Sequence, residues 1–265
     1  MTSPSNPIVF YDIASAPPVT TFAPNPWKTR LALNFKKVHY KTSWTDLTEV
    51  ATVRKSLGAL PCRKHWVDNT DFYTLPVITD PSTGAIVGDS FDIAIYLDKI
   101  YPNNPTLIPP GTLGLLKVLN SYVDRIFTSH VALTMRHFPF NPETAHLSKK
   151  EFCRRAGMDN FEDMLKIAEG ENRQKLLASF QKALSEEPFE LHGLSRAFLK
   201  QDEGPFLNGK EPMYGDLILG AWLQMYRKCL PKEEWEMLRS WNDGLWGRLS
   251  DALEEYKLVD GGRDG

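Results

Sequence analysis

The sequence contains little cysteine, no excess of either charge and no long apolar run. Its 265 residues include three cysteines, Cys62, Cys153 and Cys229, with neither a CxxC pair nor a Cys/His cluster. An odd number of cysteines argues against a disulfide framework, and the lack of metal-binding spacing argues against a structural zinc site. We therefore expect a reducing compartment and no metal.

The charge balance excludes two classes of partner. The chain has 31 Lys and Arg against 33 Asp and Glu, a formal charge of −2, and carries no basic block. This is not the electrostatic pattern of a nucleic-acid-binding or membrane-surface protein. The N-terminus has no apolar core of a signal peptide, and no segment approaches the 18 apolar residues of a membrane span. We expect a cytoplasmic protein without nucleic-acid or membrane partners.

The first part of the chain alternates between extended and helical patterns. Asn25 and Pro26 form a helix-start signal, with Asn25 as the N-cap, and Gly58 is typical of a helix end. Ser90 is expected to cap a further helix. The expected strands are residues 8–12, 39–44, 75–79 and 85–87, and the expected helices begin near Asn25 and cover 46–57 and 90–100. This order predicts an α/β domain with a mixed sheet, and residues 59–73 are expected to be irregular.

The remainder of the chain shows only helical periodicity. Residues 101–111 (YPNNPTLIPPG) have the composition of a linker. Residues 141–157 are expected to form either a loop or a short exposed helix. We therefore predict an α/β domain at 1–100, a linker at 101–111 and an all-helical domain at 112–265.

Several motifs in this arrangement resemble the glutathione transferase superfamily. Residues 22–30 (FAPNPWKTR), followed by Ala32 and Leu33, are similar to a segment of bacterial β-etherases and fungal etherase-related glutathione transferases. Residues 204–216 resemble the superfamily's C-terminal structural segment, in which Asp216 is expected to accept a hydrogen bond from the helix-cap amide. The resemblance implies a thioredoxin-like N-terminal domain, an all-α C-terminal domain and glutathione as a cosubstrate.

The resemblance also implies a glutathione site. Leu75 and Pro76 are similar to the family's cis-proline turn, where the backbone pairs with the cysteinyl part of glutathione. The pair Asp89 and Ser90 resembles the one that holds the γ-glutamyl group. A helix N-terminus and a nearby carboxylate suit a carboxylate and an ammonium ion, respectively. Three further residues have two interpretations each. Lys64 and His65 either bind the glycyl carboxylate or lie in a solvated loop. Trp27 either contacts the ligand or packs beneath the site. A catalytic Cys62 with a pKa lowered by its basic neighbours is a further alternative.

Position 23 departs from the family pattern. The family usually has a serine here that donates a hydrogen bond to the thiolate, and Ala23 has no donor. Three outcomes stay open. Thr20, Thr21 or Asn25 replaces the serine, the helix end and its amides suffice for weaker catalysis, or the protein binds ligands with little turnover.

The second substrate is expected between the domains, because clefts at domain interfaces favour small molecules. The residues expected to line that site are Phe22, Pro24, Tyr122, Phe127 and Met135. An aromatic lining would suit hydrophobic aromatic or phenolic compounds. This favours a glutathione transferase or peroxidase with weakened activity, or alternatively a non-catalytic ligandin. A non-enzymatic interaction module is disfavoured by the retained Asp89 and Ser90. Family analogy suggests a homodimer.

Overall fold

The computed structural model describes residues 3, 6–185, 194–199 and 204–259 and divides into two compact units. The first unit contains Met1–Leu107, Pro139–Phe161 and Tyr256–Gly265, and the second contains Ile108–Phe138 and Glu162–Glu255. No helix in the described part of the chain is both long and apolar enough to cross a membrane.

The first unit is built on a four-stranded mixed sheet of order β2-β1-β5-β6. Strand β1 pairs in parallel with β2 and antiparallel with β5, and β5 pairs antiparallel with β6. The buried side chains alternate along β1, where Ile8 and Phe10 are fully buried, because successive side chains point to opposite faces of a sheet. The strands are β1 (Ile8–Ile13), β2 (Tyr40–Thr45), β5 (Val77–Asp80) and β6 (Ala85–Gly88).

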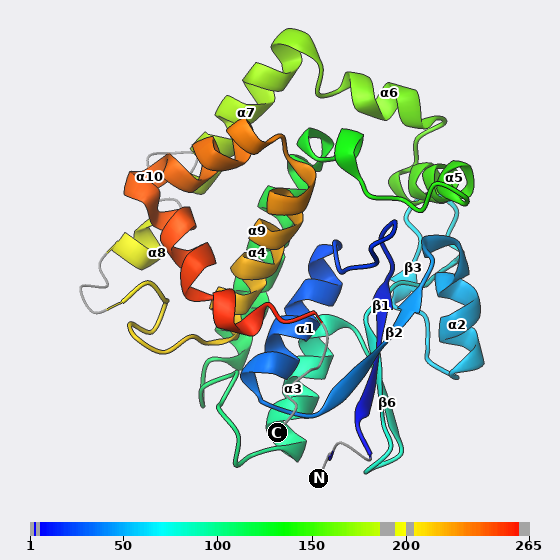
Figure 1. Cartoon of the computed structure of the whole chain (residues 1–265), viewed down its shortest axis with the longest axis vertical. Coiled ribbons are helices and arrows are strands. Elements are labelled where there is room, and N and C mark those ends of the chain that lie inside the picture. Colours follow the sequence, from blue (N-terminus) through cyan, green and yellow to red (C-terminus); the bar gives the residue numbers. More distant parts are fainter. Residues whose placement is uncertain (1–2, 4–5, 186–193, 200–203, 260–265) are drawn as a thin grey trace. The chain divides into compact units, whose positions relative to one another are not determined.

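Helices cover both faces of this sheet. Helices α1 and α3 pack against each other on one side, and α2 lies on the other (Figure 1). Their bounds are α1 (Pro24–Phe35), α2 (Val50–Ser56) and α3 (Ser90–Ile100), and α2 follows a 3₁₀ turn at Leu47–Glu49. The arrangement confirms the expected thioredoxin-like fold of the N-terminal part.

Helix α1 begins earlier than the sequence signal predicts. Ala23 occupies the N-cap and Pro24 is the first helical residue, so the expected N-cap at Asn25 is wrong. Pro24 and Pro26 both fit the first turn, because the N–H groups there have no partner within the helix. Two prolines thus produced two equivalent start signals, and the chain uses the first.

Helix α3 shows a similar shift by one residue. Asp89 is the N-cap and Ser90 is the first helical residue, so the expectation that Ser90 caps the helix is wrong. Asp89 adopts a positive φ of 68°, which is uncommon for a residue with a side chain.

The segment expected to be irregular contains a small hairpin. Strand β3 (Arg63–Lys64) pairs antiparallel with β4 (Asp71–Phe72). Strands of this length are too short to produce a visible alternation of apolar and polar residues. The hairpin is therefore a correction to the sequence prediction.

Residues 141–157 form a helix, α5 (Ala145–Ala156), that ends at Gly157 in the left-handed conformation. Three hydrogen bonds connect residues 139–155 to the rest of the first unit. The Thr144 hydroxyl donates to Asp46 (2.7 Å), Arg155 donates to the Tyr73 carbonyl (3.1 Å), and the Pro139 carbonyl accepts from the Ala16 amide (2.7 Å). These bonds explain why Pro139–Phe161 groups with the first unit. The predicted domain boundaries, which assign this segment to the helical domain, stay a prediction.

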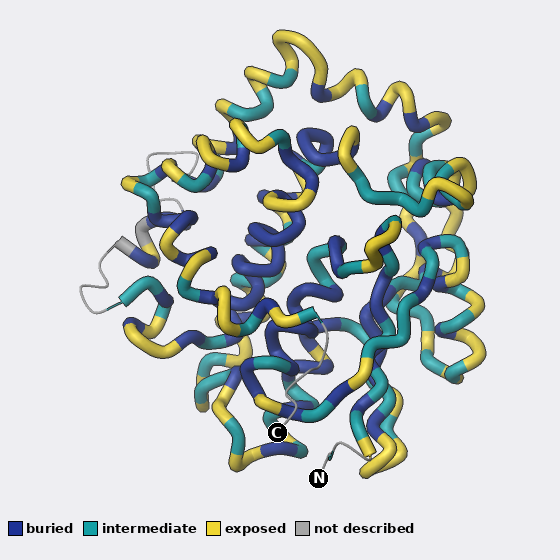
Figure 2. The backbone as a smooth tube through the Cα atoms, in the orientation of Figure 1, coloured by how far each residue is buried: buried dark blue, intermediate teal, exposed yellow. Residues whose placement is uncertain are grey.

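The second unit is helical in its described residues, as expected. Nearly every residue of α9 is buried, and α4 and α10 pack on it (Figure 2). Asp216 in its first turn accepts hydrogen bonds from the Met213 and Leu207 amides, each at 2.8 Å, which confirms the bond to the cap amide. The helices from residue 113 to 252, apart from α5, are α4 (Leu113–Ser129), α6 (Phe161–Lys166), α7 (Gly170–Ser185), α8 (Arg196–Leu199), α9 (Tyr214–Cys229) and α10 (Lys232–Ala252).

Candidate functional site

In the first turn of α1, the Asn25 amide alone has no hydrogen-bond partner among the described residues. The first three helical residues are Pro24, Asn25 and Pro26, and proline has no N–H. The next amide, of Trp27, donates to the Ala23 carbonyl at 3.1 Å. An ordinary helix end presents several unpaired amides to an anion, whereas only the Asn25 amide is available here. The helix end is thus a weaker anion site than the sequence suggested.

The residues around this helix end pack with the segment that precedes β5. Phe22 and Leu75 belong to one buried apolar cluster with Ile13 and Val77, and Ala23 packs against that cluster. The expected thiol position at Ala23 and the expected backbone contact at Leu75 are therefore neighbours in the first unit.

The segment with Asp89 and Ser90 is bonded to the segment with Leu75 and Pro76 through the backbone. The Leu75–Pro76 peptide bond is cis, as expected. The Asp89 amide donates to the Pro76 carbonyl at 3.2 Å. This bond brings the expected γ-glutamyl contacts, Asp89 and Ser90, next to the expected cysteinyl contact. An uncommon backbone conformation such as that of Asp89 often occurs at a binding site, where the surrounding structure holds it.

Arg54 in α2, which the sequence analysis missed, connects these segments. Its side chain is buried and donates to the carbonyls of Leu60 (2.8 Å) and Thr74 (2.6 Å). Its guanidinium lies 3.8 Å from the Asp89 carboxylate. A Cβ atom at Gly88 would lie 2.3 Å from the guanidinium, so a larger residue there would displace the Arg54 side chain. Arg54 thus fixes the residue before Leu75 and places a positive charge beside Asp89.

Burial and the neighbouring Asp89 together set the chemistry of Cys62. Burial of the thiol, and then the negative charge of Asp89, raise the pKa of Cys62 to about 11. The positive charge of Arg54 opposes this shift only in part. The sequence alternative in which basic neighbours lower the pKa is wrong, because burial and, after it, a carboxylate from a distant part of the chain raise the pKa of Cys62. Only the thiolate is a nucleophile, so Cys62 does not suit a catalytic role at neutral pH.

We expect Cys62 to react slowly with iodoacetamide at pH 7. With a pKa of about 11, roughly one thiol in ten thousand is ionised at that pH. The alkylation rate should rise about tenfold for each pH unit between 7 and 10. Mass spectrometry of the labelled peptide measures the rate, and Cys62→Ser is the control for labelling at the more deeply buried Cys153 and Cys229. Rapid labelling at pH 7 would contradict the raised pKa.

Thr21, one of the expected substitutes for the serine, already uses its hydroxyl proton. Its hydroxyl donates to the Asp12 carboxylate at 2.5 Å and accepts from Arg30 at 2.7 Å. A hydroxyl has one proton to donate, so Thr21 can bond a thiolate only if it releases Asp12. Thr21 therefore has a structural role between Asp12 and Arg30, whereas the backbone amide of Asn25 stays available.

Three expected glutathione contacts have other neighbours in the structure. Lys64 lies on the hairpin and pairs with Asp71 at 2.6 Å. His65 is buried there, and its ring stacks on Trp66. Trp27 is buried in the first unit, and its indole N–H has no hydrogen-bond partner among the described residues. The structure thus favours hairpin and packing roles for these residues, and their contact with glutathione stays a prediction.

The residues expected to line the aromatic site belong to different units. Phe22 and Pro24 lie in the first, and Tyr122, Phe127 and Met135 lie in the second. Phe127 is fully buried among the rings of Phe180, Trp222 and Tyr226 in the helical core. This is a correction, because Phe127 has no surface left for a ligand. Tyr122 is half-buried, with the Arg125 guanidinium 5.4 Å from its ring centre, and Met135 is buried.

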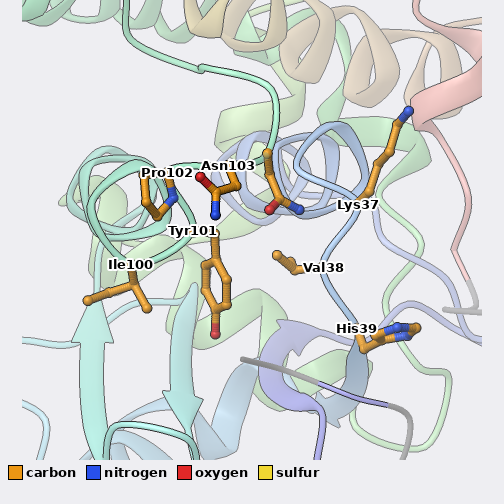
Figure 3. A pocket seen from close by; sticks show the side chains of 8 residues that line it. Lys37, Val38, His39, Ile100, Tyr101, Pro102 and Asn103 are labelled. Atoms are coloured by element: carbon orange, nitrogen blue, oxygen red, sulfur yellow. The ribbon is translucent and has the colours of Figure 1, made fainter.

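A separate pocket of about 370 Å³ lies where the ends of α1 and α3 meet (Figure 3). None of the expected site residues lines it. Of its eight lining residues only Lys37 and His39 can carry a positive charge, and Lys37 points away from Val38 and Tyr101 (Figure 3). We assign it no chemistry. In the described part of the chain, no group of three or more His, Cys, Asp or Glu residues is placed to hold a metal ion.

Known proteins resemble both parts of the chain. A family model of the glutathione S-transferase N-terminal domain matches residues 22–100, and one of the C-terminal domain matches residues 119–256. A curated relative, the glutathione S-transferase-like protein ustS of Aspergillus flavus, is 26% identical over 260 residues, which cover 95% of this chain and 91% of the relative.

Solved structures agree with these matches. A glutathione S-transferase of Ceriporiopsis subvermispora, determined in complex with glutathione, is 30% identical with a TM-score of 0.82, over 96% of this chain and 99% of that one. Glutathione transferase GSTFuA3 from Phanerochaete chrysosporium is 27% identical with a TM-score of 0.80, over 96% and 98% of the two chains. With both domains matched and a solved relative similar over almost its whole length, the chain belongs to the glutathione S-transferase family.

Proposed function

We propose that this protein binds glutathione as a cosubstrate and has weak glutathione-dependent transferase or peroxidase activity on hydrophobic aromatic or phenolic compounds. The observation that carries the proposal is the convergence of three segments in the first unit. Ala23 packs against the cluster that contains Leu75, and the Asp89 amide bonds to the Pro76 carbonyl. The glutathione-bound Ceriporiopsis relative supports the same ligand.

Each part of glutathione has a chemically suitable partner in this arrangement. The Asp89 carboxylate suits the ammonium group, and Ser90 at the start of α3 suits the γ-glutamyl carboxylate. Leu75 offers backbone groups to the cysteinyl part. The sulfur would then lie at Ala23, near the Asn25 amide. In the proposed role the protein is a cytoplasmic homodimer of the etherase-related class.

The weak activity follows from how the thiol must be ionised. An ordinary thiol has a pKa of about 8.5, and lowering it by about two units takes roughly 2.7 kcal/mol of preferential thiolate stabilisation. One hydrogen bond to a charged group supplies about 1.5–3 kcal/mol. The Asn25 amide is one such donor, whereas a serine at position 23 would add a second. We therefore expect a thiolate that forms less completely than in relatives with the serine.

The second candidate function, a ligandin, is favoured by the same residue. A protein that stores hydrophobic aromatic compounds needs a binding site for them but not a glutathione thiolate. The alanine at position 23 affects only the thiolate, because it lacks a hydroxyl donor. The two functions therefore differ in turnover and not in binding.

Retention on immobilised glutathione tests the proposal. We expect the natural protein to be retained and to be eluted by free glutathione, but not by the dipeptide Cys-Gly, which lacks the γ-glutamyl group. Peroxide reduction and conjugation of electrophilic aromatic compounds are then measured above the uncatalysed rate. Retention with background rates would favour the ligandin, and a failure to bind would contradict both functions.

A further inference from the structure

Arg30 of α1 is fully buried in the first unit, and each of its N–H groups has an acceptor. A guanidinium has five N–H donors, and Arg30 makes five hydrogen bonds. The acceptors belong to β1, to the loop before α1, to β2 and to the C-terminal segment. They are Asp12 (2.8 Å), Thr21 (2.7 Å), Tyr40 (3.3 Å), Thr42 (3.1 Å) and the carbonyl of Val259.

Aromatic rings pack close to this guanidinium. Its carbon lies 5.0 Å from the ring centre of Phe10 and 5.2 Å from that of Trp44. Stacked contacts and a rigid fork of donors define one orientation for an arginine, and lysine cannot reproduce it. The Arg30 guanidinium and the Asp12 carboxylate are both fully buried, so their attraction is not screened by water.

Arg30 thereby controls the position of the loop before α1. The Thr21 hydroxyl is held between Asp12 and Arg30, at 2.5 and 2.7 Å. Thr21 lies two residues before Ala23, which is the N-cap of α1 and the expected position of the glutathione sulfur. A shift of Thr21 would therefore move the residues that are expected to contact the glutathione thiol.

The C-terminal strap, residues 256–259, covers the other side of Arg30. The Asn34 side chain donates to the carbonyls of Tyr256 (2.7 Å) and Leu258 (3.0 Å), and the ring of Tyr256 packs edge-on against Phe35. The Val259 carbonyl accepts from Arg30. The strap is thus bound to α1 mainly through its own backbone carbonyls.

We propose that Arg30 is a positioning residue for the glutathione-binding loop and that the C-terminal strap maintains it in that role. Without the strap, Arg30 loses the Val259 carbonyl and meets water on that side. Water screens the attraction between Arg30 and Asp12, which weakens the fixed position of Thr21. The C-terminal segment therefore influences a site formed by residues at the opposite end of the sequence. The inference rests on the proposed function for the identity of the ligand.

Two truncations of the full chain separate the strap from the residues beyond it. A chain ending at Tyr256 lacks the carbonyls of Leu258 and Val259, and a matched chain ending at Asp260 retains both. A full-length Asn34→Ala variant removes two hydrogen bonds to the strap without replacing Arg30, and it also removes the acceptor of the Tyr40 hydroxyl. This variant keeps the test valid if the shorter chain fails to fold. Replacement of Arg30 itself is less informative, because it leaves Asp12 buried without its partner.

Amide hydrogen exchange without ligand is the first measurement. We expect the amides of residues 20–23 to exchange at least about tenfold faster in the chain ending at Tyr256 and in Asn34→Ala, because local opening becomes easier. The chain ending at Asp260 should match the natural protein. Unchanged exchange at residues 20–23 in both altered proteins would overturn the proposal.

The pKa of the bound glutathione thiol, from the ultraviolet absorbance of the thiolate, is the second measurement. We expect it to rise in both altered proteins and the affinity for glutathione to fall about tenfold, as for a misplaced charge-assisted hydrogen bond. A purely structural strap would lower the unfolding temperature and leave this pKa unchanged, which would also overturn the proposal. If the natural protein binds no glutathione but the exchange rates differ as expected, the proposed function fails and the positioning of the loop stands.

Discussion

Replacing Ala23 by serine is expected to raise glutathione-dependent turnover by roughly 10- to 100-fold, because one hydrogen bond to a charged group is worth about 1.5–3 kcal/mol. Ala23 has the extended backbone of an N-cap, with φ −73° and ψ 143°, and serine adopts this conformation readily. The serine hydroxyl can donate its proton to the sulfur while the Asn25 amide stays available to the same atom. The substitution thus adds a donor without removing one.

A stability effect accompanies this change and must be separated from it. Serine at an N-cap stabilises a helix by about 0.5–2 kcal/mol relative to alanine, and glycine is only a few tenths of a kcal/mol less favourable than serine. Ala23→Gly is therefore the matched control, since it improves the cap but adds no hydroxyl. Turnover at saturating glutathione, thermal unfolding and the pKa of the bound thiol are measured for all three proteins.

The expected pattern distinguishes the remaining alternatives for position 23. Ala23→Ser should lower the pKa of the bound thiol and raise turnover, whereas Ala23→Gly should affect only stability. Equal turnover in all three proteins, with glutathione still bound, would mean that the sulfur does not lie at position 23 or that another group already ionises it. Asn25 and Thr20 are then the remaining alternatives, because the Thr21 proton is bonded to Asp12.

Local patterns predict the order of the longer elements in the first unit. Short apolar runs and helical spacing identified β1, α1, β5 and α3 because each depends on neighbouring residues alone. The boundaries were less certain where two signals compete, as at Pro24 and Pro26, each of which fits the start of a helix. The β3–β4 hairpin was missed because strands of two residues carry no measurable period.

The interactions that organise the site depend on tertiary contacts, which the sequence analysis could not supply. Arg54 lies in α2, far from Asp89 in the sequence, and no local motif connects the two residues. The same is true of Arg30 and Val259, whose contact joins α1 to a segment far along the chain. The raised pKa of Cys62 depends on such a contact as well, because its basic sequence neighbours predicted the opposite direction.

The Asp89→Asn variant is expected to bind glutathione roughly 10- to 100-fold more weakly than the natural protein, because it replaces the carboxylate that faces the ammonium group. Asp92→Asn is the matched control. It removes the same charge from the first turn of the same helix, α3, and Asp92 is exposed. General loss of negative charge would weaken binding equally in the two variants, whereas a specific contact would weaken it only in Asp89→Asn.

A glutathione analogue without the γ-glutamyl amino group completes the test. The natural protein should bind this analogue about as weakly as Asp89→Asn binds glutathione, and the variant should hardly distinguish the two ligands, because either change removes the same contact. Iodoacetamide should also alkylate Cys62 faster in the variant, since the Asp89 charge and its hydrogen bond both raise the pKa of that thiol. Faster alkylation without any loss of glutathione affinity would place Asp89 beside Cys62 but outside the ligand site. A loss of affinity that is equal for both ligands would mean that the carboxylate organises Arg54 and the Leu75 segment and does not face the ammonium group.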